Sequence, residues 1–495
     1  MVAHCASAQQ PLEATWSTSR EYWYTLELNN QRAGYSHHTI ESEEATGNIR
    51  TTVLQVLHSQ RGEGVVAGVS IETVWTETSD GSPISMSMAR RLSQQPQIIE
   101  CRFLRDGSIE RRTRIGNGTW QIATHPTFTQ PWLPPDAQRR FIQQRRAADA
   151  RSISFHTLDL SADPVIATVT MTRSENAVFE HDGVMHDVEV WQINAGRDER
   201  ASRSLVHVSE DGVIVLAQEI AGGLTLIERL ATRALALQPI THLPDIIAAT
   251  TVKPDTPIRS AARVRRALYE LRITNEDDQD EGVFDIPSAA SQMVLTDAES
   301  GPIRILVDPA APFKAAAGDT DEPLYRASSL MINYDEPSVR AFSARALNRR
   351  SLTDVRARAE RLRTVVFQHI RNKNLASTFA SASETLATRS GDCTEHAVLL
   401  CALLRADGIP ARVACGLVYA EEFAGQNSIF AWHMWTQALI DGYWIDLDAT
   451  ALGPFSAAHI LFGTTALADG AVEREIVPMT AIVGRIEIRV VDLEY

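Results

Sequence analysis

Long hydrophobic runs are missing from this sequence. No stretch of about 18 uninterrupted apolar residues occurs in it, so no transmembrane helix is expected. An excess of basic residues is missing as well, because the formal net charge is −15 and binding a phosphate backbone demands clustered Lys and Arg. We therefore expect no nucleic-acid binding. The sequence has no haem, phosphate-loop or dinucleotide signature, so no cofactor is predicted.

Cysteine is scarce, with five residues in a chain of 495. The spacing of Cys5, Cys101, Cys393, Cys401 and Cys415 matches neither a zinc motif nor a dense disulfide framework. No metal site is predicted. An odd number of cysteines leaves at least one thiol free, which suits a catalytic cysteine but does not prove one.

The beginning of the sequence resembles part of an export signal. Ala6-Ser7-Ala8 is similar to a signal-peptidase site, although no apolar segment precedes it. We expect residues 1–20 to be disordered or the remnant of a signal peptide. This favours an exported, periplasmic protein, with a cytoplasmic one as the alternative.

The length of the chain predicts two or three domains. Residues 21–245 contain short alternating runs separated by Asp-Gly turns, which are typical of an antiparallel β-rich domain. A Pro- and Thr-rich linker, residues 239–260, leads to a smaller β-rich region at 255–333. The acidic loop at 275–282 lacks the regular alternation of a calcium-binding motif.

The texture changes to helix from residue 334. Apolar residues recur at helical spacing in 354–370, and further helices are expected at 381–389 and 393–406. The fold class is therefore predicted as α+β. Residues 334–463 form a core of helices against an antiparallel sheet, preceded by the β-rich domains and followed by a strand-containing extension at 464–495.

A cysteine stands at the start of the helix predicted at 393–406. Gly391 and Asp392 precede Cys393, and the helix ends where Asp407-Gly408 is followed by Pro410. Unpaired N–H groups and the positive end of the helix dipole stabilise an anion in a first turn, and the thiolate is the reactive form of cysteine. Cys401 and Cys415 lie at positions typical of packing residues.

The segment His433–Thr450 supplies an acid–base partner. It predicts two strands joined by a turn at Asp441-Gly442, with Ile440 opposite Tyr443. In this register His433 and Asp448 are diagonal neighbours, at a separation that their side chains can bridge. The opposite face of the hairpin is apolar except for one threonine and should be buried. A nucleophile, a base and an orienting carboxylate are thereby predicted, against the alternative of a core cysteine and a surface His–Asp pair.

Four separate sequence pieces resemble the transglutaminase-like superfamily, which are thiol enzymes with a papain-like core. The pieces are GDCTE at the helix start, then GIPAR and a strand, HMW beginning at His433, and WIDLDAT. The resemblance covers about residues 334–463, and the β-rich part before it is similar to that of bacterial members. It implies that Cys393 is the nucleophile, His433 the general base and acid, and Asp448 the orienter. Ala449 replaces the usual proline after this aspartate.

Residues around the predicted triad have supporting or structural interpretations. Asp392, Trp435 and Trp444 are candidates for cleft or oxyanion support, although tryptophans on a partly buried strand are as often packing residues. His396 lies one turn after Cys393 and is interpreted as structural. Glu395 is expected to serve the first turn of the helix.

The predicted activity is acyl transfer from an amide of a peptide or protein through a thioester. Hydrolysis is favoured over transglutaminase cross-linking, because nothing in the sequence indicates a calcium-dependent enzyme. One alternative is a catalytically silent binding or scaffold protein that recognises peptide or cell-envelope material. Another is a metal site built from Cys393, His396 and His433, which the helix and hairpin geometry disfavours. The oligomeric state does not follow from the sequence.

Overall fold

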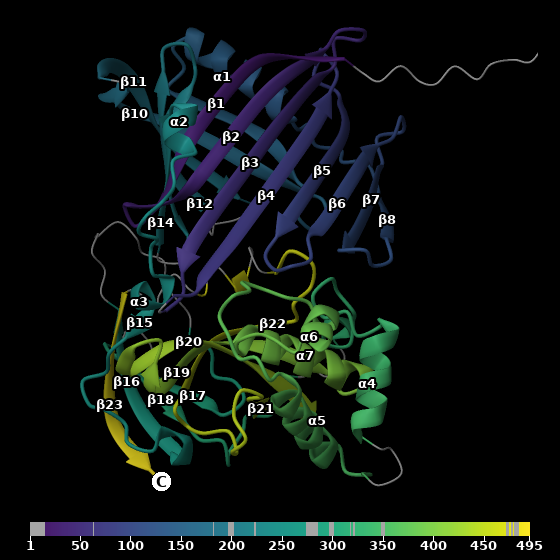
Figure 1. Cartoon of the computed structure of the whole chain (residues 1–495), viewed down its shortest axis with the longest axis vertical. Helices are drawn as coiled ribbons and strands as arrows, with labels where there is room; N and C mark the ends of the chain where they lie inside the picture. Colours follow the sequence, from purple (N-terminus) through teal and green to yellow (C-terminus); the bar gives the residue numbers. More distant parts are fainter. Residues whose placement is uncertain are drawn as a thin grey trace, which may run out of the picture.

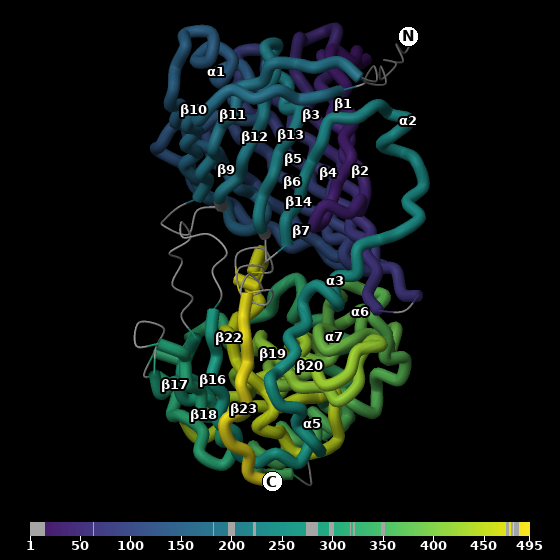
Figure 2. Tube along the Cα trace, turned by 90° about the vertical axis from the view of Figure 1, so that its left-hand side faces the viewer, coloured from purple at the N-terminus to yellow at the C-terminus, as the bar shows by residue number. Residues whose placement is uncertain are grey.

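The computed structural model describes residues 15–62, 64–181, 183–196, 202–221, 224–273, 286–296, 301–316, 318–319, 322–347, 352–471, 475–476, 479 and 485–495. A large curved β-sheet occupies one end of the molecule and a mixed helix-and-sheet part occupies the other (Figure 1). The chain passes from the first part to the second through a segment that runs along their junction (Figure 2). The expected signal-like site, the Asp182 turn position and the acidic loop at 275–282 lie outside the described residues.

The N-terminal part is one antiparallel sheet of 14 strands. Its strands are β1 Trp16–Leu28, β2 Gln31–Glu43, β3 Ile49–Gln60, β4 Val66–Glu77, β5 Pro83–Arg91, β6 Gln97–Phe103, β7 Ile109–Ile115, β8 Gln121–His125, β9 Ser152–Asp159, β10 Val165–His181, β11 Val184–Gly196, β12 Ser202–Ser209, β13 Ile214–Ala221 and β14 Leu224–Ala231. The first strand begins at Trp16, before the boundary expected at residue 21.

Two consecutive meanders make up this sheet. Strands β1–β8 follow one another in space, as do β9–β14, and the two runs join where β14 pairs with β1. The sheet curls so that Leu158 of β9 packs in the same apolar cluster as Ile99 and Ile109 of β6 and β7. Helix α1, Pro135–Ala147, contributes Phe141 to a second cluster with β9–β12. The result is a barrel-like sheet.

The C-terminal part contains two further sheets and four helices among its described residues. One sheet has the order β15-β20-β19-β22, with β21 paired to β20, and the other has the order β17-β18-β16-β23. The elements are α2 Arg233–Ala236, α3 Ile246–Ala249, β15 Thr251–Val252, β16 Arg266–Ile273, β17 Gln292–Thr296, β18 Ile303–Val307, α4 Pro337–Leu347, α5 Val355–His369, α6 Ala382–Thr388, α7 Cys393–Ala406, β19 Ala411–Phe423, β20 Gln426–Ile440, β21 Tyr443–Leu447, β22 His459–Thr465 and β23 Ile486–Glu494, where α2 and α3 precede these sheets.

Helix α7 lies at the centre of the C-terminal core. Nearly all its residues are buried, and it contacts α4, α5 and α6 as well as strand β20. The hairpin face predicted to be apolar packs against it through Met434, Ala438 and Leu447. Thr436, the polar exception on that face, donates to the carbonyl of Ala397 in the helix. The α+β class expected from the sequence is confirmed.

The expected linker and the expected C-terminal extension each add a strand to one of the two C-terminal sheets. The linker expected at 239–260 contains β15, which pairs with β20. Strand β23 from the expected 464–495 extension pairs with β16 from the expected 255–333 region, so these two segments share one sheet. None of the described helices combines the length and apolarity that crossing a membrane requires.

Candidate active site

Cys393 begins α7, and its neighbours build the first turn around it. Asp392 is the N-cap and accepts from the backbone N–H of Thr394, while Glu395 accepts from the N–H of Asp392. Gly391 has φ +149°, and a Cβ there would lie 2.4 Å from the Cβ of Glu395. The glycine is therefore required for the chain to enter the helix at this angle.

Glu395 is sealed inside the protein. Its second carboxylate oxygen accepts from the N–H of Ala380, and the residue has no exposed surface. Burial, with the nearby charge of Asp392, raises the pKa of Glu395 to about 8. Its expected role in the first turn is thus extended, because it also ties the segment before α6 to the start of α7.

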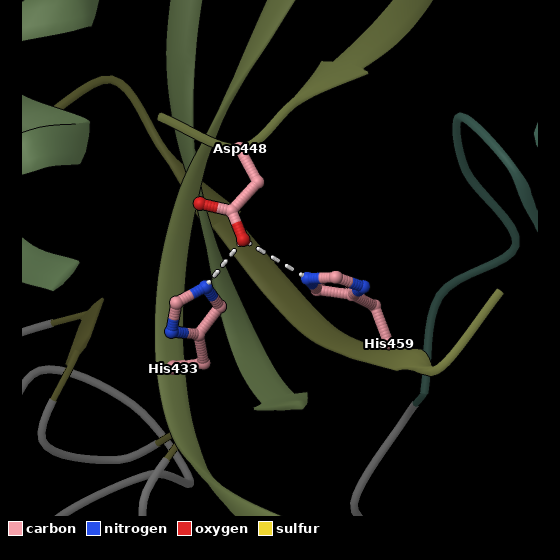
Figure 3. Close-up of side chains that lie close together, drawn as sticks. All are labelled: His433, Asp448 and His459. Carbon is pink, nitrogen blue, oxygen red and sulfur yellow. Dashed lines mark hydrogen bonds and ion pairs between the residues drawn. The ribbon is translucent and has the colours of Figure 1, made fainter. Parts of the chain in front are cut away.

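The hairpin β20–β21 places His433 and Asp448. Ile440 pairs with Tyr443 across the Asp441-Gly442 turn, and the register runs out to Thr436 opposite Leu447. Beyond the ladder, His433 Nε2 donates to Asp448 Oδ2 across 3.0 Å (Figure 3). This diagonal contact is the one the predicted register requires. Asp446, one pair closer to the turn, accepts instead from Trp435 and Gln437.

Cys393 meets the other side of the His433 ring. Because Nε2 is held by Asp448, Nδ1 is the nitrogen available to the thiol, and the Cys393 side chain lies close enough to His433 to raise the pKa of the imidazole. Burial by itself lowers the pKa of His433, but the charge of Asp448, the hydrogen bond to it and the interaction with Cys393 outweigh it. Together they raise the pKa to about 10, so the imidazole is charged at neutral pH. The three predicted triad residues therefore converge.

Asp448 is held by several donors. Oδ1 accepts from the backbone N–H and the hydroxyl of Thr450, and Oδ2 accepts from both His433 and His459 (Figure 3). Burial alone raises the pKa of this carboxyl, but the charges and hydrogen bonds of His433 and His459 hold it well below the usual range. Arg363 of α5 donates to the carbonyl of Asp448 and fixes the backbone there.

His459 is a partner that the sequence reasoning missed. Its Nδ1 faces the carbonyl of Ser456 and its Nε2 faces Asp448, 3.3 Å away. Both ring nitrogens therefore lie against oxygen atoms of the protein. His433, Asp448 and His459 form a cluster of metal-ligand type. In this structure Asp448 accepts a hydrogen bond from each of the two rings. Among the described residues, the alternative set of Cys393, His396 and His433 is not such a cluster.

The triad opens into a cavity of about 700 Å³ at the junction of the two parts of the molecule. Cys393, His396 and His433 line one end of it. Strands of the N-terminal sheet and helix α3 supply an apolar wall, made of Leu28, Leu57, Leu224, Leu226, Ile246 and Ile247. The N-terminal domain, whose role the sequence left open, therefore contributes directly to the surroundings of the cysteine.

Arg61, at the end of β3, fastens the N-terminal sheet to the helix start. Its Nη2 lies 3.0 Å from Asp392 Oδ2, and its Nη1 donates to the carbonyl of Ser377. The predicted cleft residue Asp392 is thus the N-cap of α7, a lining residue of the cavity and one half of an ion pair between domains. No local pattern around Arg61 indicates this contact, because its partner lies more than 300 positions away.

His396 has a different environment from the one expected. It lines the cavity beside Cys393, and its Nδ1 donates to the carbonyl of Asp392. Its Nε2 is buried without a hydrogen-bond partner. Burial, assisted by the charge of Lys373, lowers the pKa of His396. The ring therefore keeps an unpaired acceptor that is enclosed by the protein.

Trp435 and Trp444 do not line this cavity, which agrees with the packing alternative and not with cleft support. Trp435 packs beside the rings of His433 and His459, and its indole donates to Asp446. Trp444 lies in another apolar cluster, and its indole donates to Asp319. Both faces of the hairpin are covered, so these tryptophans support the hairpin from within the protein.

Comparison with known proteins identifies the C-terminal core. Residues 343–449 match the family model of the transglutaminase-like superfamily, so the chain contains a transglutaminase-like domain preceded by a β-rich region. No curated protein sequence matched the chain. A β-barrel-like protein of domain of unknown function DUF1849 from Brucella abortus is 11% identical, covering 43% of this chain and 95% of its own, with a TM-score of 0.33. The periplasmic domain of TgpA from Pseudomonas aeruginosa is 15% identical, covering 40% and 88%, with a TM-score of 0.26.

Proposed function

From the transglutaminase-like domain at residues 343–449, we propose that this chain is a thiol enzyme that acts on amide bonds through a thioester. One observation carries the proposal. Cys393 contacts His433, whose other nitrogen donates to Asp448 across 3.0 Å, at the wall of a cavity. A nucleophile, an acid–base group and an orienting carboxylate in contact are the components that acyl transfer needs.

Acylation uses the groups as follows. Cys393 Sγ attacks the amide carbonyl carbon, and the carbon–nitrogen bond breaks as the His433 imidazolium gives its proton to the leaving amine. The acyl group stays on sulfur as a thioester. The backbone N–H of Cys393 has no partner in the described part of the chain, and a first-turn N–H is suited to stabilise the oxyanion.

Deacylation completes the reaction. The now neutral His433 takes a proton from water, the oxygen attacks the thioester carbonyl, and the carbon–sulfur bond breaks to give the acid and the free thiol. An amine in place of water yields a new amide, which is cross-linking if both partners are proteins. Hydrolysis is the proposed outcome.

Alkylation of the thiols tests the proposal. We expect iodoacetamide to modify Cys393 faster than Cys101, Cys401 and Cys415, because burial raises the pKa of each of the other three thiols. His433→Ala should slow alkylation of Cys393, and the matched control Cys401→Ala should leave its rate unchanged. Labelling of Cys393 that ignores His433→Ala would show that the thiol and imidazole do not act together.

Turnover separates the remaining possibilities. Release of free amine from amide substrates, compared with incorporation of a labelled amine into a glutamine peptide, distinguishes hydrolysis from cross-linking. Equal release by the wild type and Cys393→Ala would contradict an enzymatic role and favour the binding or scaffold alternative.

A further inference from the structure

The cavity beside Cys393 is aliphatic along the wall that the N-terminal sheet and α3 provide. Leu28 of β1 and Leu226 of β14 are paired across neighbouring strands, and Leu57 and Leu224 belong to the same end of the sheet. Val418 and Phe423 of β19 and Trp432 of β20 face the cavity from the catalytic core. At about 700 Å³ the cavity has the size of a small-molecule site.

The polar side chains that line the cavity away from the triad each make at least one hydrogen bond or ion pair within the protein, although the Lys373 ammonium keeps further donors. The Lys373 ammonium donates to the carbonyl of Thr450, and Asn374 donates to Ser390. Thr250 and Thr251 donate to the carbonyl of Ile246 and to Gln426, and Arg61 is held as described above. Apart from the Lys373 ammonium and the Trp432 indole, this wall therefore leaves little for a peptide backbone to bind.

The catalytic end is different. There the His396 Nε2 acceptor is buried and unpartnered, next to Cys393. That atom is enclosed by the protein, so the polar groups open to a substrate at this end are those of Cys393 and His433, which line the cavity. The cavity thus combines one polar end, suited to an amide, with an extended aliphatic wall.

We propose that the aliphatic part of the cavity binds the long hydrocarbon chain of an acyl group, so that the substrate is a long-chain N-acyl amide. This rests on the proposed function, since it places the chain on the carbonyl side of the bond that Cys393 attacks. The opposite assignment is disfavoured by charge. A departing amine becomes an ammonium ion at neutral pH and must return to water, whereas an acyl chain in a thioester is uncharged. The amine is then the part that a peptide or another polar molecule supplies.

Alkyl chloromethyl ketones test the proposal, because their alkyl chain occupies the acyl side. The thiolate sulfur displaces chloride, forming a sulfur–carbon bond, and mass spectrometry identifies the labelled cysteine. In experiments on the full-length protein, we expect the rate of Cys393 labelling to rise by up to about fourfold for each methylene of the reagent that enters the cavity. A dodecyl reagent should react at least about a hundredfold faster than the methyl reagent, a factor that roughly three to four of its eleven additional methylenes provide on entering the cavity.

Variants locate the effect. Leu57→Asn and Leu226→Asn should lower the dodecyl rate about tenfold more than the methyl rate, and continued labelling by the methyl reagent shows that the site is folded. The matched control Ile122→Asn, at an exposed apolar position that does not line the cavity, should change neither rate.

The outcomes separate the two proposals. If neither reagent labels Cys393, the thiol-enzyme proposal fails. If both label it at the same rate, or if a polar peptide chloromethyl ketone reacts faster than the dodecyl reagent, the thiol is functional but the acyl-chain proposal is wrong. Binding of dodecanamide to Cys393→Ala, measured by calorimetry, provides a readout that needs no thiol chemistry, and the absence of binding would also overturn the acyl-chain proposal.

Discussion

Replacing Asp448 by Asn removes the charge that keeps His433 protonated. The rise of the His433 pKa from 6.5 to about 10 corresponds to roughly 5 kcal/mol in favour of the charged ring. The carboxylate supplies most of this against the opposing effect of burial. In Asp448→Asn burial prevails, and we expect the His433 pKa to fall below 6.5. The ring is then neutral at pH 7 and places no positive charge beside Cys393.

Nitrogen NMR of histidine-labelled protein measures the change directly. In the wild type the His433 resonance, assigned by its loss in His433→Gln, should remain that of an imidazolium until the pH approaches 10. In Asp448→Asn the same resonance should be that of a neutral ring at pH 7, and alkylation of Cys393 should slow on the order of a hundredfold. If His433 titrates at the same pH in both proteins, the electrostatic reasoning is refuted.

The pH dependence of folding stability should reflect the ionisation of His433 and Asp448. The folded-state pKa of His433 is raised, so its contribution is full below about 6.5 and is lost as the pH rises towards 10. The pKa of Asp448 is lowered, so its contribution is present above about 3.8 and is lost on further acidification. The difference in denaturant midpoint between the wild type and Asp448→Asn should therefore be largest near pH 4–6.5 and shrink towards pH 10. A difference that grows between pH 7 and 10 would have the wrong sign.

Three further substitutions have distinct expected outcomes. Arg61→Met leaves the Asp392 carboxylate without its ion partner and should cost about 2–3 kcal/mol in thermal unfolding, whereas the exposed pair broken by Arg266→Met should cost under about 1 kcal/mol; equal costs would contradict the interdomain role. Glu395→Gln places an amide NH₂ against one of the two backbone N–H groups, of Ala380 and Asp392, that the carboxyl group accepts from. It should therefore lower the free energy of unfolding in urea by about 1–3 kcal/mol. The control Glu487→Gln, at an exposed position, should not change it. His459→Phe removes a hydrogen bond to the Asp448 carboxylate and should lower turnover about tenfold, as expected for a hydrogen bond to a charged group; unchanged turnover would show that His459 only packs.

The parts of the site that the sequence predicted are those determined by local rules. Helix α7 spans the predicted residues, 393–406, because its apolar stripe lies within this range and its cap, Asp392, and terminating glycine, Gly408, lie directly beside it. The pairing of Ile440 with Tyr443 follows from a two-residue turn, and this register alone places His433 near Asp448. The transglutaminase-like resemblance is confirmed for the core.

The parts that the sequence did not predict depend on contacts between distant segments. Arg61 reaches Asp392, β15 joins β20, and β23 joins β16, and none of these pairings has a signature within its own segment. The role of the tryptophans stayed open because a hairpin pattern shows which residues share a face but not what covers that face. His459 was missed because its strand has the composition of an ordinary buried strand.

The pairing of β1 with β14 has a consequence for biosynthesis. Trp23 lies opposite Ala231, so about 200 further residues must be synthesised before β1 can pair with β14. Meanwhile the β1–β8 meander can assemble from adjacent hairpins as the chain emerges, with the open side of β1 displaying unsatisfied amides and carbonyls to other nascent chains. Slowed translation between residues 130 and 230 should therefore prolong this vulnerable interval and increase aggregation during expression.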